Sequence, residues 1–318
     1  MKTNALLLPM AMLLGACSVL TKAPPKSESM PTARFEARPL PGSRHGHRAE
    51  VLGSRVVAFG GFDRAADDDD RGSRWTQILD LRSGVWRRGA DMNLGRGFFG
   101  SAVVDGTIVA IADSIERYDI EADRWSVVAP VGTMPTSHFG AAAIGRRIFA
   151  LGGFPVLAGG FVGFDLETGR SFDPPEPEGL AKGDHLPVVA TIGDEIHFVG
   201  GLRDEGFQPI AEHQVFDGRA WRRAAPPPRP TWAKLAAYAV HGRTLYLFDE
   251  EGGLRYDKDA DRWSTVASIG RGYALVMPAA VVLGDLVHVF GGFFPEPRQE
   301  LLIYDPARDQ WTTRAASR

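Results

Sequence analysis

The feature that most constrains this chain is a pattern that recurs six times along it. Each copy has two apolar stretches joined by a turn, and the second stretch ends in two glycines or in two residues at the equivalent position. A variable loop follows, then an aspartate, a polar turn and a large aromatic residue. The diglycines are Gly60, Gly61, Gly152, Gly153, Gly200, Gly201, Gly291 and Gly292, and the equivalent pairs in the other two copies are Ala112, Asp113, Asp249 and Glu250. The aromatics are Trp86, Trp125, Phe172, Trp221, Trp263 and Trp311, which are 39 to 49 residues apart. Such a period predicts stacked copies of one unit, because a single copy is too small to bury a core.

Each copy predicts four short strands. In the last copy the first two strands are expected at 279–283 and 286–292, the third at 303–305, and the fourth from 309–311 onward. Four-stranded sheets that stack around an axis bury both of their faces, and closure into a ring removes long exposed edges. We therefore expect an all-β, six-bladed β-propeller over residues 34–318. The glycines, the aromatics and the aspartates are expected to be architectural; these aspartates are Asp80, Asp119, Asp165, Asp217, Asp257 and Asp305.

The order of diglycine, aspartate and tryptophan resembles the kelch repeat. The resemblance implies four antiparallel strands per blade. It leaves the closure of the ring open, because two segments compete for one edge of the last blade. One is 34–39, with Phe35 in the aromatic position, and the other is the strand expected from Trp311.

The N-terminus predicts export and lipidation. Residues 5–14 form an apolar run broken only by Pro9, too short to span a bilayer, for which about 20 residues are needed, but typical of a signal peptide. The run ends in Leu-Gly-Ala before Cys17, the only cysteine of the chain, which resembles the lipobox of bacterial lipoproteins. We expect a signal peptide over 1–16, a lipidated Cys17 that anchors the protein to a membrane, and a flexible tether over 17–33, rich in Pro, Ser and Lys. A plain secretory signal with an incidental cysteine is the alternative.

The residues after Cys17 include no aspartate that would signal retention in the inner membrane, so we expect an exported protein of the outer membrane, on its periplasmic side or at the cell surface. The net charge is −3, with 36 basic and 39 acidic residues. Since no basic excess exists, nucleic acid is not an expected partner. The chain shows no phosphate-binding loop, nucleophile elbow or zinc-protease motif, so no cofactor is predicted and no catalytic residue is assigned.

Partner binding is expected on one face of the propeller. If the strands of a blade are named A to D from the axis outward, the B–C and D–A loops share a face. The B–C loops vary most in length and are shortest in blades 2 and 5, which predicts a trough between the other blades. Variable loops on a fixed scaffold commonly carry function. The candidate ligand-binding residues at the starts of the A strands are Arg44, His45, His47, Arg96, Phe99, His138, His185, Trp232, Arg271 and Tyr273.

Metal binding is not predicted. Three histidines (His47, His138 and His185) occupy similar positions in three blades and could converge on the axis, but no short ligand spacing supports a site. The acidic run 67–70 is expected to be a solvated loop tip, since it lacks the glycine and the spaced ligands of a calcium loop.

The function favoured by the sequence is a binding or scaffold module of the envelope for a protein or glycan partner, rather than an enzyme. The alternative implied by the kelch resemblance is a carbohydrate-active enzyme of the sialic-acid mutarotase type. In that enzyme Arg44, Arg96 or Arg271 would bind a carboxylate. A copper radical oxidase of the same fold needs a Cys–Tyr crosslink, and Cys17 lies outside the propeller.

Overall fold

The structure is a computed structural model. It describes residues 37–63, 72–130, 132–133, 137–154, 161–177, 187–203, 208–231, 236–249, 251–269, 277–293 and 299–315. The chain divides into two compact units, Met1–Ala33 and Arg34–Arg318, and all described residues belong to the second. The expected signal peptide, Cys17, the tether and Phe35 lie outside the described residues.

Within the described part of the chain, no helix has the length and apolar character that a membrane crossing requires.

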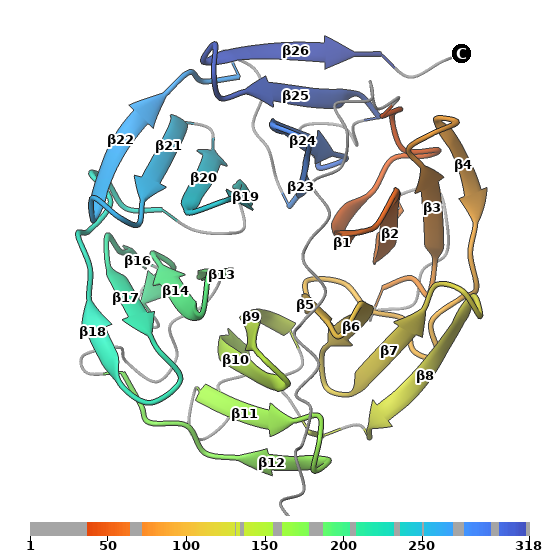
Figure 1. Ribbon diagram of the computed structural model, residues 1–318, viewed down its shortest axis with the longest axis horizontal. Helices are drawn as coiled ribbons and strands as arrows, with labels where there is room; N and C mark the ends of the chain where they lie inside the picture. The colour runs from red at the N-terminus through yellow and green to blue at the C-terminus, as the bar shows by residue number, and fades with distance from the viewer. Residues whose placement is uncertain are drawn as a thin grey trace, which may run out of the picture. The chain divides into compact units, whose positions relative to one another are not determined.

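Six four-stranded antiparallel sheets surround a central axis (Figure 1), so the predicted all-β, six-bladed propeller is confirmed. Blade 1 consists of β1 (His45–Leu52), β2 (Arg55–Phe62), β3 (Thr76–Asp80) and β4 (Val85–Arg88). Blade 2 consists of β5 (Gly100–Val104), β6 (Thr107–Ile111), β7 (Ile115–Asp119) and β8 (Arg124–Ala129). Blade 3 consists of β9 (Ser137–Ile144), β10 (Arg147–Phe154), β11 (Phe161–Asp165) and β12 (Arg170–Phe172).

The second half of the chain repeats this arrangement. Blade 4 consists of β13 (Val188–Ile192), β14 (Glu195–Val199), β17 (His213–Phe216) and β18 (Trp221–Arg223), and its B–C loop carries a small hairpin of β15 (Leu202–Arg203) and β16 (Gln208–Pro209). Blade 5 consists of β19 (Ala237–His241), β20 (Thr244–Asp249), β21 (Gly252–Asp257) and β22 (Arg262–Val266). Blade 6 consists of β23 (Ala279–Leu283), β24 (Leu286–Phe290), β25 (Leu301–Asp305) and β26 (Gln310–Arg314).

Both ends of the propeller take part in closing the ring. The C-terminal strand β26 is the fourth strand of blade 6. The segment before blade 1 is not a strand in its described residues; instead Ala37 and Leu40 are buried in the apolar core shared by blades 6 and 1. The Arg314 guanidinium donates to the Ala37 carbonyl at 2.9 Å. The N-terminal segment therefore seals the blade interface, while β26 completes the sheet.

The diglycines of blades 1, 4 and 6 each join their blade to the next one. In blade 4, the amide of Gly201 donates to the Thr231 carbonyl at the entry to blade 5 (2.7 Å), and a Cβ on Gly200 would lie 2.0 Å from that oxygen. Both glycines have positive φ, 62° and 113°, which side chains strongly disfavour. The same contact in blade 6, from Gly292 to the Arg44 carbonyl (2.7 Å), closes the ring.

The repeated aspartates and tryptophans hold turns and interfaces. Asp119 accepts hydrogen bonds from the amides two and three residues later (both 3.0 Å), which fixes the C–D turn as an Asx turn. Tryptophan indoles reach the preceding blade: Trp311 donates to the Ala267 carbonyl at 2.9 Å. Equivalent Asx turns form at Asp80, Asp165, Asp217, Asp257 and Asp305.

Three blades carry a second interblade link that sequence reasoning missed. In blade 5, Tyr256 donates through its hydroxyl to Asp261 at 2.7 Å. The same carboxylate oxygen accepts the amide of Ala225 in blade 4 at 3.0 Å. The equivalent pairs are Tyr118 with Asp123 and Tyr304 with Asp309, whose carboxylates accept the amides of Ala90 and Ala267. A Tyr followed five residues later by Asp is the signal that could have revealed this link.

Candidate functional site

The predicted ligand-binding residues divide into two groups. Five have described side chains, of which four are buried (Arg44, His47, Arg96 and Phe99) and one, His45, is half-buried. The side chains of the others lie outside the described residues, so their role stays a prediction; these are His138, His185, Trp232, Arg271 and Tyr273.

Arg96 belongs to a closed polar network in blade 2. Its guanidinium donates to the Glu116 carboxylate and to the carbonyl of Ser114 (3.1 Å). Glu116 is fully buried and also accepts the amides of Asn93 (2.8 Å) and Leu94 (3.1 Å). Burial lowers the pKa of Arg96, and the charge of Glu116 counteracts this. The network fixes the entry to β5, because it ties residues 93–96 to β7.

Arg44 and His47 are packed at the interface between blades 6 and 1. The Arg44 guanidinium carbon lies 4.3 Å from the Trp75 ring centre, and its Nη2 lies 3.8 Å from a carboxylate oxygen of Asp63. Burial, followed by the charge of Arg44, lowers the pKa of His47 to about 3, so the imidazole is neutral. A Cβ on Gly291 would lie 2.8 Å from the His47 ring, which shows how tightly blade 6 packs there.

His45 is part of an aromatic cluster on the face of the B–C and D–A loops. The loop-face aromatic cluster consists of His45, Phe62, Phe98 and Phe293, all half-buried. The His45 ring centre lies 5.6 Å from that of Phe62 and 5.5 Å from that of Phe293, and the Phe62 and Phe98 centres are 4.8 Å apart. The cluster therefore joins the loop ends of blades 6, 1 and 2.

The backbone under this cluster is unusual. Phe98 has a φ of 56°, and Gly46 and Met277 have 64° and 54°. The Phe98 amide donates to the Gly46 carbonyl (3.0 Å), and the Gly46 amide donates to the Met277 carbonyl (2.8 Å). A bulky residue in the left-handed region costs about 1–3 kcal/mol, and such strain is concentrated at functional positions.

A second candidate site, which the sequence did not indicate, is the axial channel. We use this name for the cavity of about 590 Å³ lined by the A strands β1, β5, β9, β13, β19 and β23. Residues of the A–B turns (Asp105, Gly145 and Gly193) also line it, so the cavity reaches the face opposite the aromatic cluster. This volume lies within the range of small-molecule sites.

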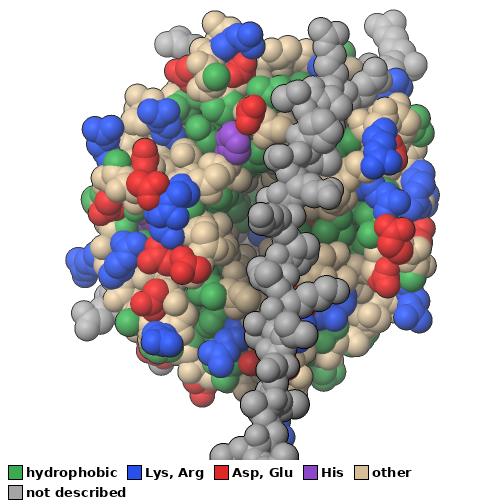
Figure 2. Space-filling view, in the orientation of Figure 1, with side chains coloured by type: hydrophobic (Ala, Val, Ile, Leu, Met, Phe, Trp, Pro, Cys, Tyr) green, Lys and Arg blue, Asp and Glu red, His purple; other side chains and the backbone are tan. Residues whose placement is uncertain are grey.

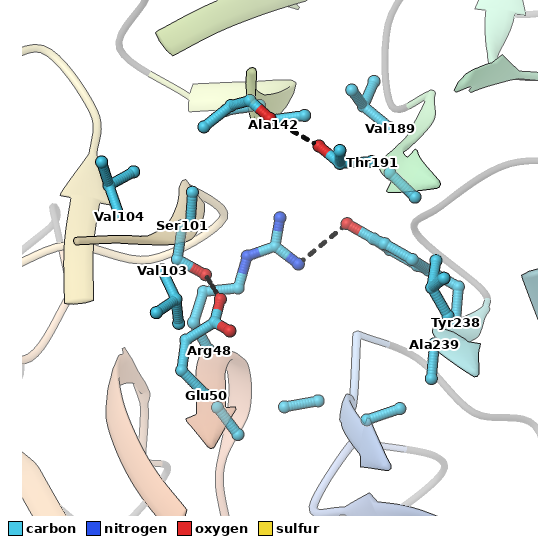
Figure 3. Close-up of a pocket in the computed structure, with 18 of the residues that line it drawn as sticks. Arg48, Glu50, Ser101, Val103, Val104, Ala142, Val189, Thr191, Tyr238 and Ala239 are labelled. Carbon is cyan, nitrogen blue, oxygen red and sulfur yellow. Dashed lines mark hydrogen bonds between the residues drawn. The ribbon is translucent and has the colours of Figure 1, made fainter. Parts of the chain in front are cut away.

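Polar side chains converge inside the channel (Figure 3). The Arg48 guanidinium extends from β1 toward β19, where its Nη1 donates to the Tyr238 hydroxyl at 3.0 Å. Its Nε donates to the Phe99 carbonyl at 2.7 Å. Ser101 donates to Glu50 Oε1 at 2.6 Å. Burial raises the pKa of Glu50, against the opposing effects of the Ser101 hydrogen bond and the charge of Arg48.

The remaining channel wall consists mostly of small or branched apolar residues from β5, β9, β13, β19 and β23. They include Ala102, Ala141, Ala143, Val189, Val240 and Ala280. Because alanines leave space at the axis, the channel stays open between six packed strands.

One face of the molecule is visible in Figure 2. On its coloured part, Lys, Arg, Asp and Glu lie mainly toward the rim, with both signs interspersed, and hydrophobic and uncharged side chains lie nearer the centre. Recognition on that part of the surface therefore depends on individual contacts rather than on a bulk charge of one sign.

No group of three or more His, Cys, Asp or Glu residues that could hold a metal ion is present among the described residues. Of the three histidines considered as metal ligands, His47 is described, and the side chains of His138 and His185 lie outside the described part of the chain.

Comparison with known proteins supports the assignment of the repeat. The family model of the Kelch motif matches residues 43–93, which span blade 1. The chain is a kelch-repeat propeller. Kelch-like protein 36 from Bos taurus is 25% identical over 276 residues, which cover 77% of this chain and 43% of the relative. An F-box/kelch-repeat protein from Arabidopsis thaliana is 32% identical over 139 residues, covering 39% of this chain and 34% of the relative. The kelch propeller thus spans less than half the length of these curated relatives.

A solved structure has a similar fold. The structure of YjhT superimposes with a TM-score of 0.70 at 12% sequence identity, covering 88% of this chain and 99% of that chain. At this identity the similarity concerns the fold alone.

Proposed function

We propose that this kelch propeller is an exported module, anchored to the outer membrane through a lipid on Cys17, that binds a protein partner with the face of its B–C and D–A loops. The likeness to kelch-like proteins supports a protein-binding role, and the lipobox-like sequence before Cys17 supports the anchor. The A–B and C–D turns are short, so the variable loops of the opposite face provide the surface on which binding specificity can differ.

The observation that carries the proposal is the loop-face aromatic cluster. Its four rings belong to three blades and are each only half-buried, although each touches another ring of the cluster. Aromatic residues are enriched at the energetic centres of protein interfaces because they bury a large area at a small entropic cost. The left-handed backbone of Phe98 orients one of these rings, and a fold tolerates that strain where the position is useful.

The alternative function, a sugar-acid enzyme, would bind a carboxylate through arginines of the A-strand entrances. The two of these arginines whose side chains are described make other contacts. Arg96 is tied to Glu116 and Ser114, and Arg44 lies against Trp75 and near Asp63. Neither arrangement offers an open carboxylate clamp, so the geometry favours the binding module.

The test is site-specific photo-crosslinking in intact cells that produce the full chain. A photoreactive phenylalanine analogue at Phe62 or Phe293 should yield a discrete crosslinked protein. The same analogue at Val127, an exposed residue on β8, serves as the control position. Phe98→Ala should abolish the crosslink while the thermal midpoint stays within a few degrees. The proposed interface would be refuted if the analogue at Val127 gave the same crosslinked protein in equal yield, or if Phe98→Ala left the crosslink unchanged.

The anchor is tested separately. Labelling with an alkyne fatty acid should mark the wild-type chain in the outer-membrane fraction, and Cys17→Ser should remove the label and release the protein from the membrane. Labelling that persists in Cys17→Ser would reject the anchor without affecting the interface.

A further inference from the structure

We propose that the axial channel is a second binding site, which takes a small monocarboxylate through the Arg48 guanidinium and the Tyr238 hydroxyl. The site is distinct from the loop-face aromatic cluster, because the cavity reaches the opposite face through the A–B turns.

The first support is an excess of hydrogen-bond donors in the channel. A guanidinium has five N–H groups, and Arg48 uses one for the Phe99 carbonyl and one for Tyr238. The three others have no partner among the described residues. The Tyr238 oxygen accepts from Arg48, which leaves the hydroxyl hydrogen of Tyr238 available to a ligand. These donors are available to a ligand, and a carboxylate accepts two parallel bonds from a guanidinium.

The second support is the charge balance inside the channel. Among the described residues, Arg48 forms no ion pair within 4.0 Å, and the acid of the channel whose pKa its charge lowers is Glu50, on the same strand. At the mouth, Arg146 and Asp105 neutralise each other at 2.7 Å. A ligand anion would therefore meet the Arg48 guanidinium inside a cavity, where ionic hydrogen bonds are stronger than in bulk water.

The carboxylate of Glu50 lies on β1, the strand that also carries Arg48. Its Oε1 accepts the Ser101 hydroxyl, and burial raises the pKa of its side chain. A bound anion would raise the pKa of Glu50 further, since a second negative charge nearby disfavours the ionised form. Protonation of Glu50 on binding would add a donor to the site and remove its repulsion of the ligand.

The apolar wall indicates an organic ligand rather than an inorganic anion. Alanines and valines from five strands surround the polar groups, and they offer no further hydrogen bonds to a fully hydrated ion. They can instead bury the carbon skeleton of a small carboxylate, which gains about 25 cal/mol per Å² of apolar surface removed from water.

The experiment is titration calorimetry of the full chain in mild detergent. The ligands are propionate and lactate, and the matched neutral controls are propionamide, lactamide and glycerol. Both carboxylates should bind with millimolar affinity or better and at least 10-fold more tightly than the amides. Arg48→Met should weaken carboxylate binding about 10- to 100-fold, the loss expected for charged hydrogen bonds.

Three further variants separate binding from folding. Arg255→Met removes an exposed arginine of β21 that donates to Ser264 and does not line the channel, and it should leave binding unchanged. Tyr238→Phe should weaken binding several-fold without loss of the fold. Glu50→Gln, which stays neutral, should bind the carboxylates at least as tightly as the wild type. If the thermal midpoint of Arg48→Met falls by more than a few degrees, Tyr238→Phe and Glu50→Gln decide the question.

The proposal fails if neither carboxylate binds. It also fails if amides or glycerol bind as tightly as the carboxylates, or if Arg48→Met and Tyr238→Phe both retain wild-type affinity. None of these results would affect the loop-face interface, which is tested by crosslinking.

Discussion

The link between Tyr256 and Asp261 joins blades 4 and 5 through one carboxylate. Tyr256→Phe removes only the hydroxyl and keeps the buried ring, which packs against His213 and Trp263 with ring centres 4.4 and 5.3 Å apart. A hydrogen bond to a charged group contributes about 1.5–3 kcal/mol. Because Asp261 is exposed, water replaces part of the lost bond. We expect Tyr256→Phe to lower the free energy of unfolding by about 1–2 kcal/mol at pH 7.

The effect should depend on pH in a defined direction. The Ala225 amide and then the Tyr256 hydroxyl hold the pKa of Asp261 below its usual 3.8. A carboxylate with a lowered folded pKa stabilises the protein above its unfolded pKa, and this stabilisation is lost as the pH falls through the folded value. The difference between the wild type and Tyr256→Phe should therefore be constant from pH 7 to about 4.5 and should shrink below 3.8.

Urea unfolding of the wild type, Tyr256→Phe, Asp261→Asn and the double variant measures the coupling. The fold should persist in Tyr256→Phe, because blades 3 and 4 carry Phe164 and Phe216 before the repeat aspartate where blade 5 has this tyrosine. The reasoning would be refuted by a cost below about 0.3 kcal/mol at pH 7, or by additive effects in the double variant, since contacting residues are expected to couple by 0.5 kcal/mol or more.

Three further predictions concern stability. Gly291→Ala should lower the free energy of unfolding, measured in urea, by several kcal/mol more than Gly53→Ala does. Both glycines have positive φ, but only a Cβ on Gly291 would lie against the Arg44 carbonyl oxygen, at 2.4 Å. Equal losses for the two variants would show that blade 6 relaxes freely. Arg96→Met should lower the free energy of unfolding by about 3–5 kcal/mol because it leaves Glu116 buried without its cation, and adding Glu116→Gln should recover part of this loss in thermal denaturation. Finally, burial lowers the pKa of four histidines from 6.5 to about 3 or 4, so below pH 6.5 the unfolded chain takes up more protons than the folded one. The free energy of unfolding should therefore fall as the pH drops below 6.5, by up to about 1.4 kcal/mol per pH unit for each histidine. Unchanged urea midpoints between pH 7 and 5 would contradict this. The four are His47, His197, His213 and His288.

The structure changes the meaning of several sequence signals. Arg96 and His47 have the residue types of a binding site, yet both are buried in contacts between strands and blades. The sequence could not distinguish these roles, because the partner of Arg96, a loop residue, is Glu116, 20 residues away on β7. His45, by contrast, lies half-buried in an aromatic cluster on the expected face.

The sequence by itself determined the blade number, the four-strand unit and the positions of the turns. These depend on local chemistry that repeats at a fixed interval: glycines that allow positive φ, aspartates that cap turns and tryptophans that reach the preceding blade. Each signal acts over a few residues or between neighbouring repeats, so a periodic pattern reveals it.

Only the tertiary structure decided the axial channel and the aromatic cluster. Arg48 meets Tyr238 across 190 positions of sequence, and the cluster brings His45 against Phe293. Neither pair has a characteristic spacing, because closure of the ring, rather than local chain geometry, brings blade 1 near blades 5 and 6. Sites of this kind are not repeated from blade to blade, and the features that distinguish them appear only when six similar units surround one axis.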